Sequence, residues 1–333
     1  MNYKKGRKAL FHRVIIESGA PTSRAVRHYD SDIHEQQFQE FLKEAQVPPN
    51  LEKSQIFPFL RRLPTRTVTD AQNTIFRKYN GSLRWAFQPV IDGDIIPRPP
   101  LETWQLGLWH KMPIMTGFNR NEGSLYVDKS LQESAGFTEF FKTLIPLLST
   151  SDIDTIDRLY PDPLRYPDSP YTDTRDGVGA QYKRIEAAYG HYAYVAPVRQ
   201  TAELASASMS HPVYIYQWAL ISTVLNGAQH GDNKNYEVCD PKITSISASQ
   251  KELARVVNAY ITNFISSGDP NKTNIPARPR WEPYGESKKA MVFGAGNMEL
   301  VGGKAGPAAE LQDDEWGRKE SEFWWSKVHL SED

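Results

Sequence analysis

The chain has 333 residues, which is enough for one large domain or two smaller ones. Hydrophobic residues make up 39% and charged residues 24%, an ordinary composition for a globular protein. The formal net charge is −1, so bulk electrostatics give no reason to expect nucleic acid or an anionic membrane as a partner.

Membrane-spanning and disulfide-rich classes are also disfavoured. No apolar run approaches the roughly 20 residues that cross a bilayer, so we expect no transmembrane segment. The chain starts with a basic segment, residues 1–8, and His12 and Arg13 interrupt the apolar stretch behind it. That pattern is typical of a strand rather than a signal peptide, and it leaves the compartment undetermined. The single cysteine, Cys239, excludes an internal disulfide and a thiolate metal cluster, and we interpret it as a small buried or half-buried residue without chemistry.

The first predicted element is a strand. Residues 11–16 (FHRVII) end in a β-branched apolar run, and the turn residues ESGAP follow, as expected for a strand buried in a parallel sheet. A helix is predicted from Ser31 or Asp32, with capping-box spacing between Asp32 and Glu35. Its expected apolar face consists of Ile33, Phe38, Phe41, Leu42 and Ala45.

The middle of the chain alternates weak and strong signals. Residues 47–110 are rich in proline and aromatics with little periodicity, and residues 87–94 (FQPVIDGD) predict a loop or a short strand pair. A second core strand is predicted at Met112–Met115, ending at Thr116-Gly117. Two helices are expected within 137–160, broken at Pro146, the second of them starting near Ser151-Asp152.

The last part of the chain carries the clearest patterns. After a loop at 163–178, residues 182–208 are helical in pattern and 213–218 (VYIYQW) predict a third core strand. A long helix is expected from Ser249, capped with Glu252 and stopped by Gly268-Asp269-Pro270. Its apolar positions are Leu253, Val256, Val257, Tyr260, Ile261 and Phe264. A final helix is expected at 316–325, and no repeat or linker divides the chain, so we treat residues 1–333 as part of one domain.

An acid and a histidine follow two of the predicted strands. Glu122 lies in TGFNRNEGS (116–124) and His230 in NGAQHGD (226–232). Taken alone, each is more simply a loop residue. Together they have the order of the last two members of the α/β-hydrolase triad, in which serine, acid and histidine follow along the chain. The serine turn Gly-x-Ser-x-Gly does not precede them.

Several segments resemble one family. Residues 10–21 (LFHRVIIESGAP) resemble the strand behind the nucleophile helix of type-B carboxylesterases, the family of cholinesterases and fungal lipases. Residues 87–93 are similar to its Pro-Val-Asp-Gly loop, and 117–123 (GFNRNEG) to its acid motif, with Asn121 in place of an aspartate. Residues 227–231 (GAQHG) resemble its histidine motif, and 260–271 its late helix. The resemblance runs from Phe11 to Trp325 and implies an α/β fold: an incomplete α/β-hydrolase with the C-terminal strands of the central sheet and flanking helices.

The resemblance also implies roles. Glu122 would orient His230 and stabilise its cation, and His230 would take the proton from a serine hydroxyl and return it to the leaving alcohol. Ser18 matches a family serine close behind the site, with a supporting role at most. No cofactor is implied, and the implied ligand is a small-molecule carboxylic ester. The eight histidines show no metal-ligand spacing.

The departures from the family concern the nucleophile. In the family the serine elbow and the glycine-rich oxyanion loop precede the strand that Phe11 begins, and residues 1–10 contain no serine. Neither Ser18 nor Ser287 (GESKK, 285–289) has the Gly-x-Ser-x-Gly pattern in the right chain order. Loss of a serine nucleophile costs on the order of 10⁶ in kcat. We therefore expect no meaningful esterase turnover from this chain alone.

Three explanations stay open. The chain is an ester-hydrolase family member whose first half is absent from this sequence, or a non-catalytic binding or remnant protein on the same scaffold, or one part of a two-chain enzyme with a complementing polypeptide. In each case the strand at residues 11–16 would lack one neighbour, so we expect the isolated chain to be poorly soluble or to seek a partner. The identity of the ester is not encoded in these motifs.

Overall fold

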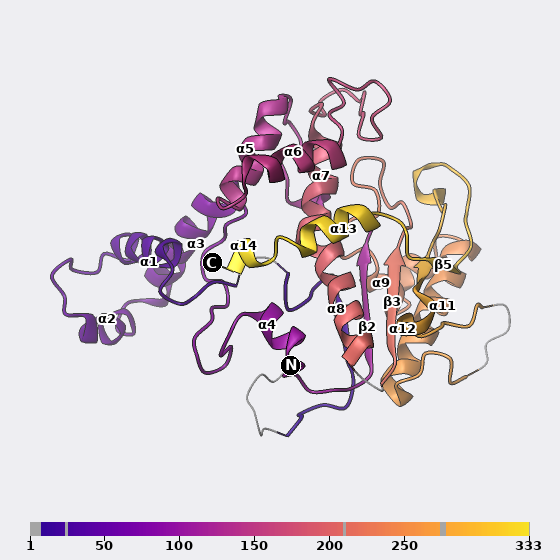
Figure 1. Cartoon of the computed structure of the whole chain (residues 1–333), viewed down its shortest axis with the longest axis horizontal. Helices are drawn as coiled ribbons and strands as arrows, with labels where there is room; N and C mark the ends of the chain where they lie inside the picture. The colour runs from indigo at the N-terminus through magenta and orange to yellow at the C-terminus, as the bar shows by residue number, and fades with distance from the viewer. Residues whose placement is uncertain (1–7, 24–25, 209–210, 274–277, 333) are drawn as a thin grey trace.

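A five-stranded sheet organises the protein. The computed structural model describes residues 8–23, 26–208, 211–273 and 278–332, so most of the basic segment at residues 1–8 lies outside the described residues. The sheet order is β1-β2-β3-β4-β5, with β1 to β4 parallel and β5 antiparallel to β4. The strands are β1 (Val14–Glu17), β2 (Ile114–Asn119), β3 (Val213–Trp218), β4 (Lys289–Phe293) and β5 (Ala309–Asp313). The expected α/β class is confirmed (Figure 1).

The two central strands are buried because helices cover both faces of the sheet. Every residue of β2 and β3 is buried. Side chains alternate along a strand, so Val213 and Ile215 pack toward α8 (Ala196–Ser208), whereas Tyr214 and Trp218 pack toward α11 (Ala248–Ser267). This two-sided burial explains why both strands appear in the sequence as apolar runs.

The remaining helical elements surround this core. They are α1 (Asp32–Glu44), α2 (Lys53–Leu60), α3 (Thr65–Asn80), α4 (Pro100–Gln105), η1 (Glu122–Leu125), α5 (Ser134–Leu144), α6 (Thr150–Leu159), α7 (Tyr182–Gly190), the π-helical η2 (His191–Val195), α9 (Lys234–Glu237), α10 (Pro241–Thr244), α12 (Tyr284–Ser287), η3 (Glu299–Val301), α13 (Arg318–Trp325) and α14 (His329–Glu332). The loop predicted at 163–178 contains no helix or strand.

Two predicted caps were wrong. α11 begins at Ala248, one residue earlier than expected, and its cap lies two residues earlier, because the Ser247 side chain accepts from the Gln250 N–H and Ser249 already lies inside the helix. In α1, Asp32 is the first helical residue, and the cap residue Ser31 makes no side-chain capping bond. A reciprocal capping box does form at α6, between Ser149 and Asp152. The predicted end of α11 at Gly268 is confirmed.

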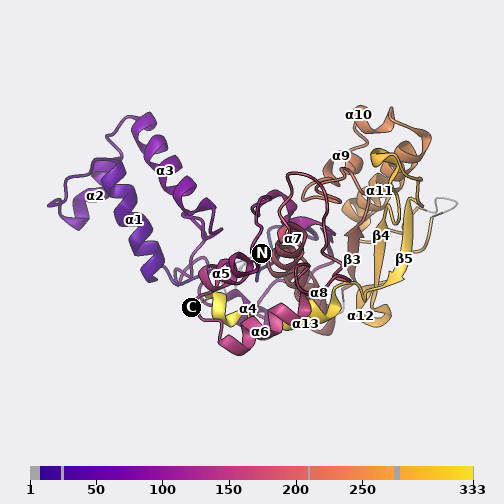
Figure 2. The same cartoon turned by 90° about the horizontal axis from the view of Figure 1, so that it is seen from above.

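Residues 47–110 contain three helices that their sequence did not reveal. α2 contains Pro58 and has no buried residue, and α3 buries only Ala71 and Ile75. The apolar periodicity is weak because α2 and α3 pack on α1 in a small core of their own. Figure 2 shows α1, α2 and α3 together as a lobe that extends away from the sheet. Residues 87–94 form a loop, joined to the chain before α1 by a single bridge between Ile91 and His28.

β1 lies at the edge of the sheet, as expected. It pairs with β2 on one side, and no other strand of the described residues pairs with it. Its side chains are half-buried or exposed, in contrast to those of β2. The predicted poor solubility of the isolated chain stays a prediction.

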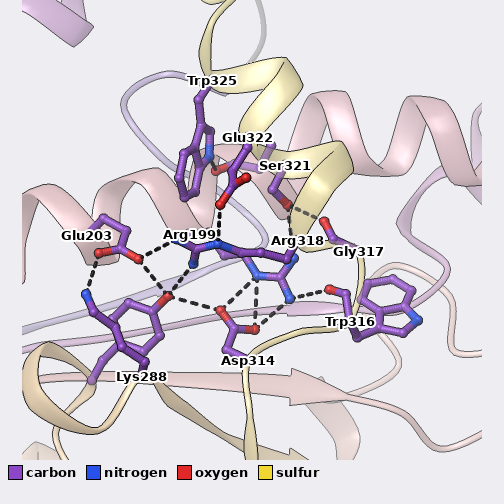
Figure 3. Close-up of polar contacts among 12 residues, drawn as sticks. Arg199, Glu203, Lys288, Asp314, Trp316, Gly317, Arg318, Ser321, Glu322 and Trp325 are labelled. Carbon is purple, nitrogen blue, oxygen red and sulfur yellow. Dashed lines mark hydrogen bonds and ion pairs between the residues drawn. The ribbon is translucent and has the colours of Figure 1, made fainter. Parts of the chain in front are cut away.

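A buried ion pair holds the last long helix against the body. α13 packs on α8, where Arg199 donates to both carboxylate oxygens of Asp314 at 2.6–3.0 Å. Arg199 also donates to Ser321 and to the Trp316 carbonyl, and Arg318 pairs with Glu203 (Figure 3). This network fixes the chain from Asp314 into α13 beside α8. No helix within the described ranges is long and apolar enough to span a bilayer.

Candidate active site

Glu122 and His230 follow adjacent parallel strands. Glu122 opens η1 after β2, and His230 lies in the loop after β3. Since parallel strands end at the same edge of a sheet, the two loops meet there, and Asn121 and Gln229 form a β-bridge between them. The two candidate residues, 108 positions apart in the sequence, are thereby brought into contact.

The Glu122 carboxylate is buried and fully engaged. Its Oε2 lies 2.6 Å from Nδ1 of His230, and its Oε1 accepts from the Ser18 hydroxyl at 2.5 Å and from the Asn119 N–H at 2.7 Å. An ionised carboxylate can accept from all three partners at once, which satisfies every one of these groups. His230 then carries its proton on Nδ1, which leaves the lone pair on Nε2 available as a base.

The His230 ring is packed between aromatic side chains and remains partly open. Tyr126 and Tyr194 lie with ring centroids 5.6 and 5.0 Å from it, and 27% of the His230 side chain is exposed. Nε2 makes no hydrogen bond with any described residue. Tyr189 and Tyr192 are buried core residues.

Asparagine side chains hold the two loops together. Asn119 Nδ2 donates to the Gln229 carbonyl at 2.5 Å. Asn121 accepts from the Ala228 N–H at 2.9 Å through Oδ1 and donates to Glu186 at 3.2 Å through Nδ2. Only an amide performs both tasks without an added proton, which gives the asparagine at this position a structural reason.

Gly123 allows the acid loop to lie directly on α7. A Cβ at this position would stand 2.1 Å from the Glu186 carbonyl oxygen, so no larger residue fits without moving the loop. The close approach places Glu186 beside the acid loop. Neither Glu186 nor the role of Asn121 was found from the sequence, because both depend on contacts between distant segments.

The two candidate serines lie away from the base nitrogen. Ser18 donates to Glu122 and so lies on the Nδ1 side of the pair. Ser287 lies in α12, which packs on α8 near His211 and Pro212 at the amino end of β3, opposite the edge that carries His230. Cys239 is half-buried, and burial raises the pKa of its thiol. Among the described residues, no group of three or more His, Cys, Asp or Glu side chains could hold a metal ion.

Known proteins resemble this chain along most of its length. A family model described as "Carboxylesterase family" matches residues 2–304. Secreted lipase 4 of Gibberella zeae is 27% identical, over 97% of this chain and 56% of its own length. Neuroligin-2 of Homo sapiens is 26% identical, over 80% of this chain and 32% of its own length. The chain thus spans little more than half of one relative and a third of the other.

The fold has a counterpart among solved structures. The crystal structure of Aspergillus niger EstA superposes with a TM-score of 0.78 at 19% identity, over 100% of this chain and 62% of that one. At this identity the match establishes the fold, which is that of an α/β-hydrolase. Together with the family match over most of its length, it shows that the chain belongs to the carboxylesterase family.

Proposed function

We propose that Glu122 and His230 are the acid and the base of a serine ester hydrolase. The observation that carries the proposal is the 2.6 Å contact between the Glu122 carboxylate and Nδ1 of His230, with the carboxylate held by two further donors. Such a carboxylate fixes the histidine tautomer and stabilises the imidazolium that forms during the reaction. Ser18 and Asn119 act as positioning residues for Glu122.

The chemistry assigned to His230 is proton transfer in two directions. Nε2 accepts the proton of an attacking hydroxyl as the new C–O bond forms at the ester carbonyl. The imidazolium then returns the proton to the departing alcohol, and a water molecule repeats the sequence to release the acid. The substrate class is a small carboxylic ester, in line with the family and with the relative named as a lipase.

No described residue supplies the attacking hydroxyl to the base. Ser18 donates to Glu122, and within the described ranges Nε2 of His230 makes no hydrogen bond. We therefore propose that these 333 residues alone do not turn over esters, and that activity requires a nucleophile and oxyanion donors supplied from outside them.

A hydrolysis assay tests this proposal in two stages. The purified chain should hydrolyse p-nitrophenyl acetate no faster than its His230→Ala variant. Addition of the portion of Secreted lipase 4 that this chain does not match should create activity. Glu122→Gln should then lower kcat by roughly 10⁴, the scale for loss of a triad acid. Glu139→Gln, an exposed carboxylate on α5, is the matched control.

Two outcomes would refute the proposal. One is robust, inhibitor-sensitive hydrolysis by the chain alone. The other is complemented activity that survives His230→Ala. A non-catalytic role on the same scaffold remains the alternative, and the intact Glu122–His230 contact favours the hydrolase.

A further inference from the structure

A cleft lies where the acid loop meets α7. It has a volume of about 340 Å³, and residues from four segments line it. The lining residues used below are Arg120, Tyr171, Lys183, Glu186, His191 and Trp316. Neither Glu122 nor His230 lines this cleft, so it is separate from the candidate active site.

Three lining residues carry buried polar atoms that no described residue satisfies. They are Arg120 Nε, Glu186 Oε1 and His191 Nε2. The Glu186 and His191 residues are only 2% and 5% exposed. A buried polar atom without a partner costs about 1–3 kcal/mol, so three around one cleft call for a shared explanation.

The unpartnered His191 nitrogen is a donor. The Trp324 indole N–H donates to the Tyr160 hydroxyl at 3.0 Å, and that hydroxyl lies 3.0 Å from His191 Nδ1. Since indole can only donate, Tyr160 accepts from Trp324, and the arrangement that leaves no hydroxyl proton unpaired has Tyr160 donating to Nδ1. Burial, with a contribution from Arg199, lowers the His191 pKa to about 3, so the ring is neutral and its proton is on Nε2.

Arg120 is a cation without an acidic partner. Its guanidinium donates to the neutral Gln217 amide at 3.3 Å and lies 5.7 Å from the Trp316 ring centroid. No carboxylate among the described residues forms an ion pair with it. Burial lowers the Arg120 pKa, yet a guanidinium stays charged in proteins, so the cleft contains a positive charge that no described carboxylate contacts as an ion pair.

The Glu186 carboxyl group lies near one hydrogen-bond donor and near other charged side chains. One oxygen accepts from Asn121 at 3.2 Å, and the other has no partner. Burial raises the Glu186 pKa to about 7, against the opposing effect of Lys183, with a further increase from Glu122. The other titratable groups nearby are Tyr171 from the preceding loop and Glu320 from α13. A protonated Glu186 would add a third donor to the cleft.

Trp316 and Gly317 form the part of the cleft next to His191, and hydrogen bonds hold them in place. Gly317 has φ +63°, and a Cβ there would stand 3.2 Å from His191 Nε2 and cover it. The Arg199 guanidinium holds the Trp316 carbonyl, and Ser321 donates to the Gly317 carbonyl at 2.8 Å (Figure 3). These contacts fix the Trp316 ring at the edge of the cleft.

We propose that this cleft binds a small organic carboxylate. The anion compensates Arg120, accepts from His191 Nε2–H and from the protonated Glu186 carboxyl, and places its apolar part against Trp316. A cleft of about 340 Å³ falls in the range of small-ligand sites and suits an aromatic or branched monocarboxylate. The proposal goes beyond the ester-hydrolase role and does not depend on it.

Calorimetric titration of the full 333-residue chain at pH 6 tests this site, with benzoate as the probe and benzamide as its uncharged counterpart. Benzoate should bind with one-to-one stoichiometry, and benzamide should not. Arg120→Gln should weaken benzoate binding at least tenfold. His230→Ala, in the other site, and Arg158→Gln, an exposed arginine on α6, should leave it unchanged. Absence of saturable binding, or binding that His230→Ala removes and Arg120→Gln does not, would overturn the proposal.

A pH series isolates the part played by Glu186. For the wild-type chain, the benzoate Kd should increase by up to about tenfold per pH unit above pH 7, as Glu186 becomes an anion. Glu186→Gln keeps an uncharged donor at this position, so its Kd should stay flat from pH 6 to pH 8. An identical pH dependence in both proteins would refute the assignment. Far-UV circular dichroism of each variant confirms that the fold is retained.

Discussion

Glu122 and Glu186 are two buried carboxyl groups on opposite sides of one short loop, and they differ in their donors. Glu122 accepts three hydrogen bonds, from Ser18, Asn119 and His230. Glu186 accepts one, from Asn121, and burial raises its pKa to about 7. Both groups are buried, yet the geometry of Glu122 is fixed by its three donors, whereas one oxygen of Glu186 has no partner among the described residues. The number of donors, more than burial, decides which kind of site each can form.

The largest expected effect comes from removal of the saturated carboxylate. Glu122→Leu leaves the Ser18 hydroxyl, the Asn119 N–H and the His230 Nδ1–H without an acceptor, and should cost about 4 kcal/mol of unfolding free energy. Glu186→Leu leaves only the Asn121 amide without an acceptor. It should lower the free energy of unfolding by less than about 1 kcal/mol at pH 8, because the wild-type chain buries an ionised Glu186 at that pH. Urea denaturation of both variants at pH 8 measures the difference. If both variants lose the same free energy of unfolding, the number of donors does not distinguish the two carboxyl groups.

The second effect is a pH dependence. In the folded state Glu186, with a pKa of about 7, binds its proton more tightly than it does in the unfolded state. Its contribution therefore lowers the free energy of unfolding between about pH 4.5 and pH 7, and this contribution is constant above pH 7. The size of this fall is about 3 kcal/mol. Glu186→Gln should therefore gain stability relative to wild type on going from pH 5 to pH 8. Urea midpoints at the two pH values provide the measurement, and a constant difference between the two proteins would contradict it.

The smallest effect concerns one donor to Glu122. Ser18→Ala removes a hydrogen bond to a buried carboxylate that retains two others, and should cost about 1.5 kcal/mol. Ser326→Ala, which removes an exposed hydroxyl that donates to the Phe323 carbonyl, is the matched control and should stay within about 0.5 kcal/mol of wild type. If both variants unfold at the same urea concentration, Ser18 does not support the acid.

The sequence predicted the core of the fold where local patterns and burial agree. The strand at residues 213–218 has the predicted bounds, and the helix that ends at Gly268 has the predicted end. It failed where a helix packs outside the main core, as in α2 and α3, and where the choice between Ser247 and Ser249 as a cap depended on backbone geometry. The π-helical turn at His191–Val195 left no signal in the sequence either.

The site was predictable to the same extent. Short motifs with glycines beside them singled out Glu122, His230 and Ser18, because each motif lies within a few consecutive residues. The structure brings the three side chains together. Glu186 and His191 carried no such pattern, and the acid motif that contains Arg120 and Asn121 did not reveal what these two side chains contact. Their chemistry arises from neighbours far along the chain, such as Ala228 for Asn121 and Trp316 for Arg120.

By itself, the sequence determined the family, and it predicted β1 to β3 and the candidate pair Glu122 and His230, because these are written in local hydrophobic patterns and short motifs. It did not predict β4 and β5. Only the tertiary structure decided which buried polar atoms have partners. That depends on how loops at one edge of the sheet meet α7 and α13, since hydrogen bonding is satisfied or denied by atoms that lie close in space while remaining distant in sequence.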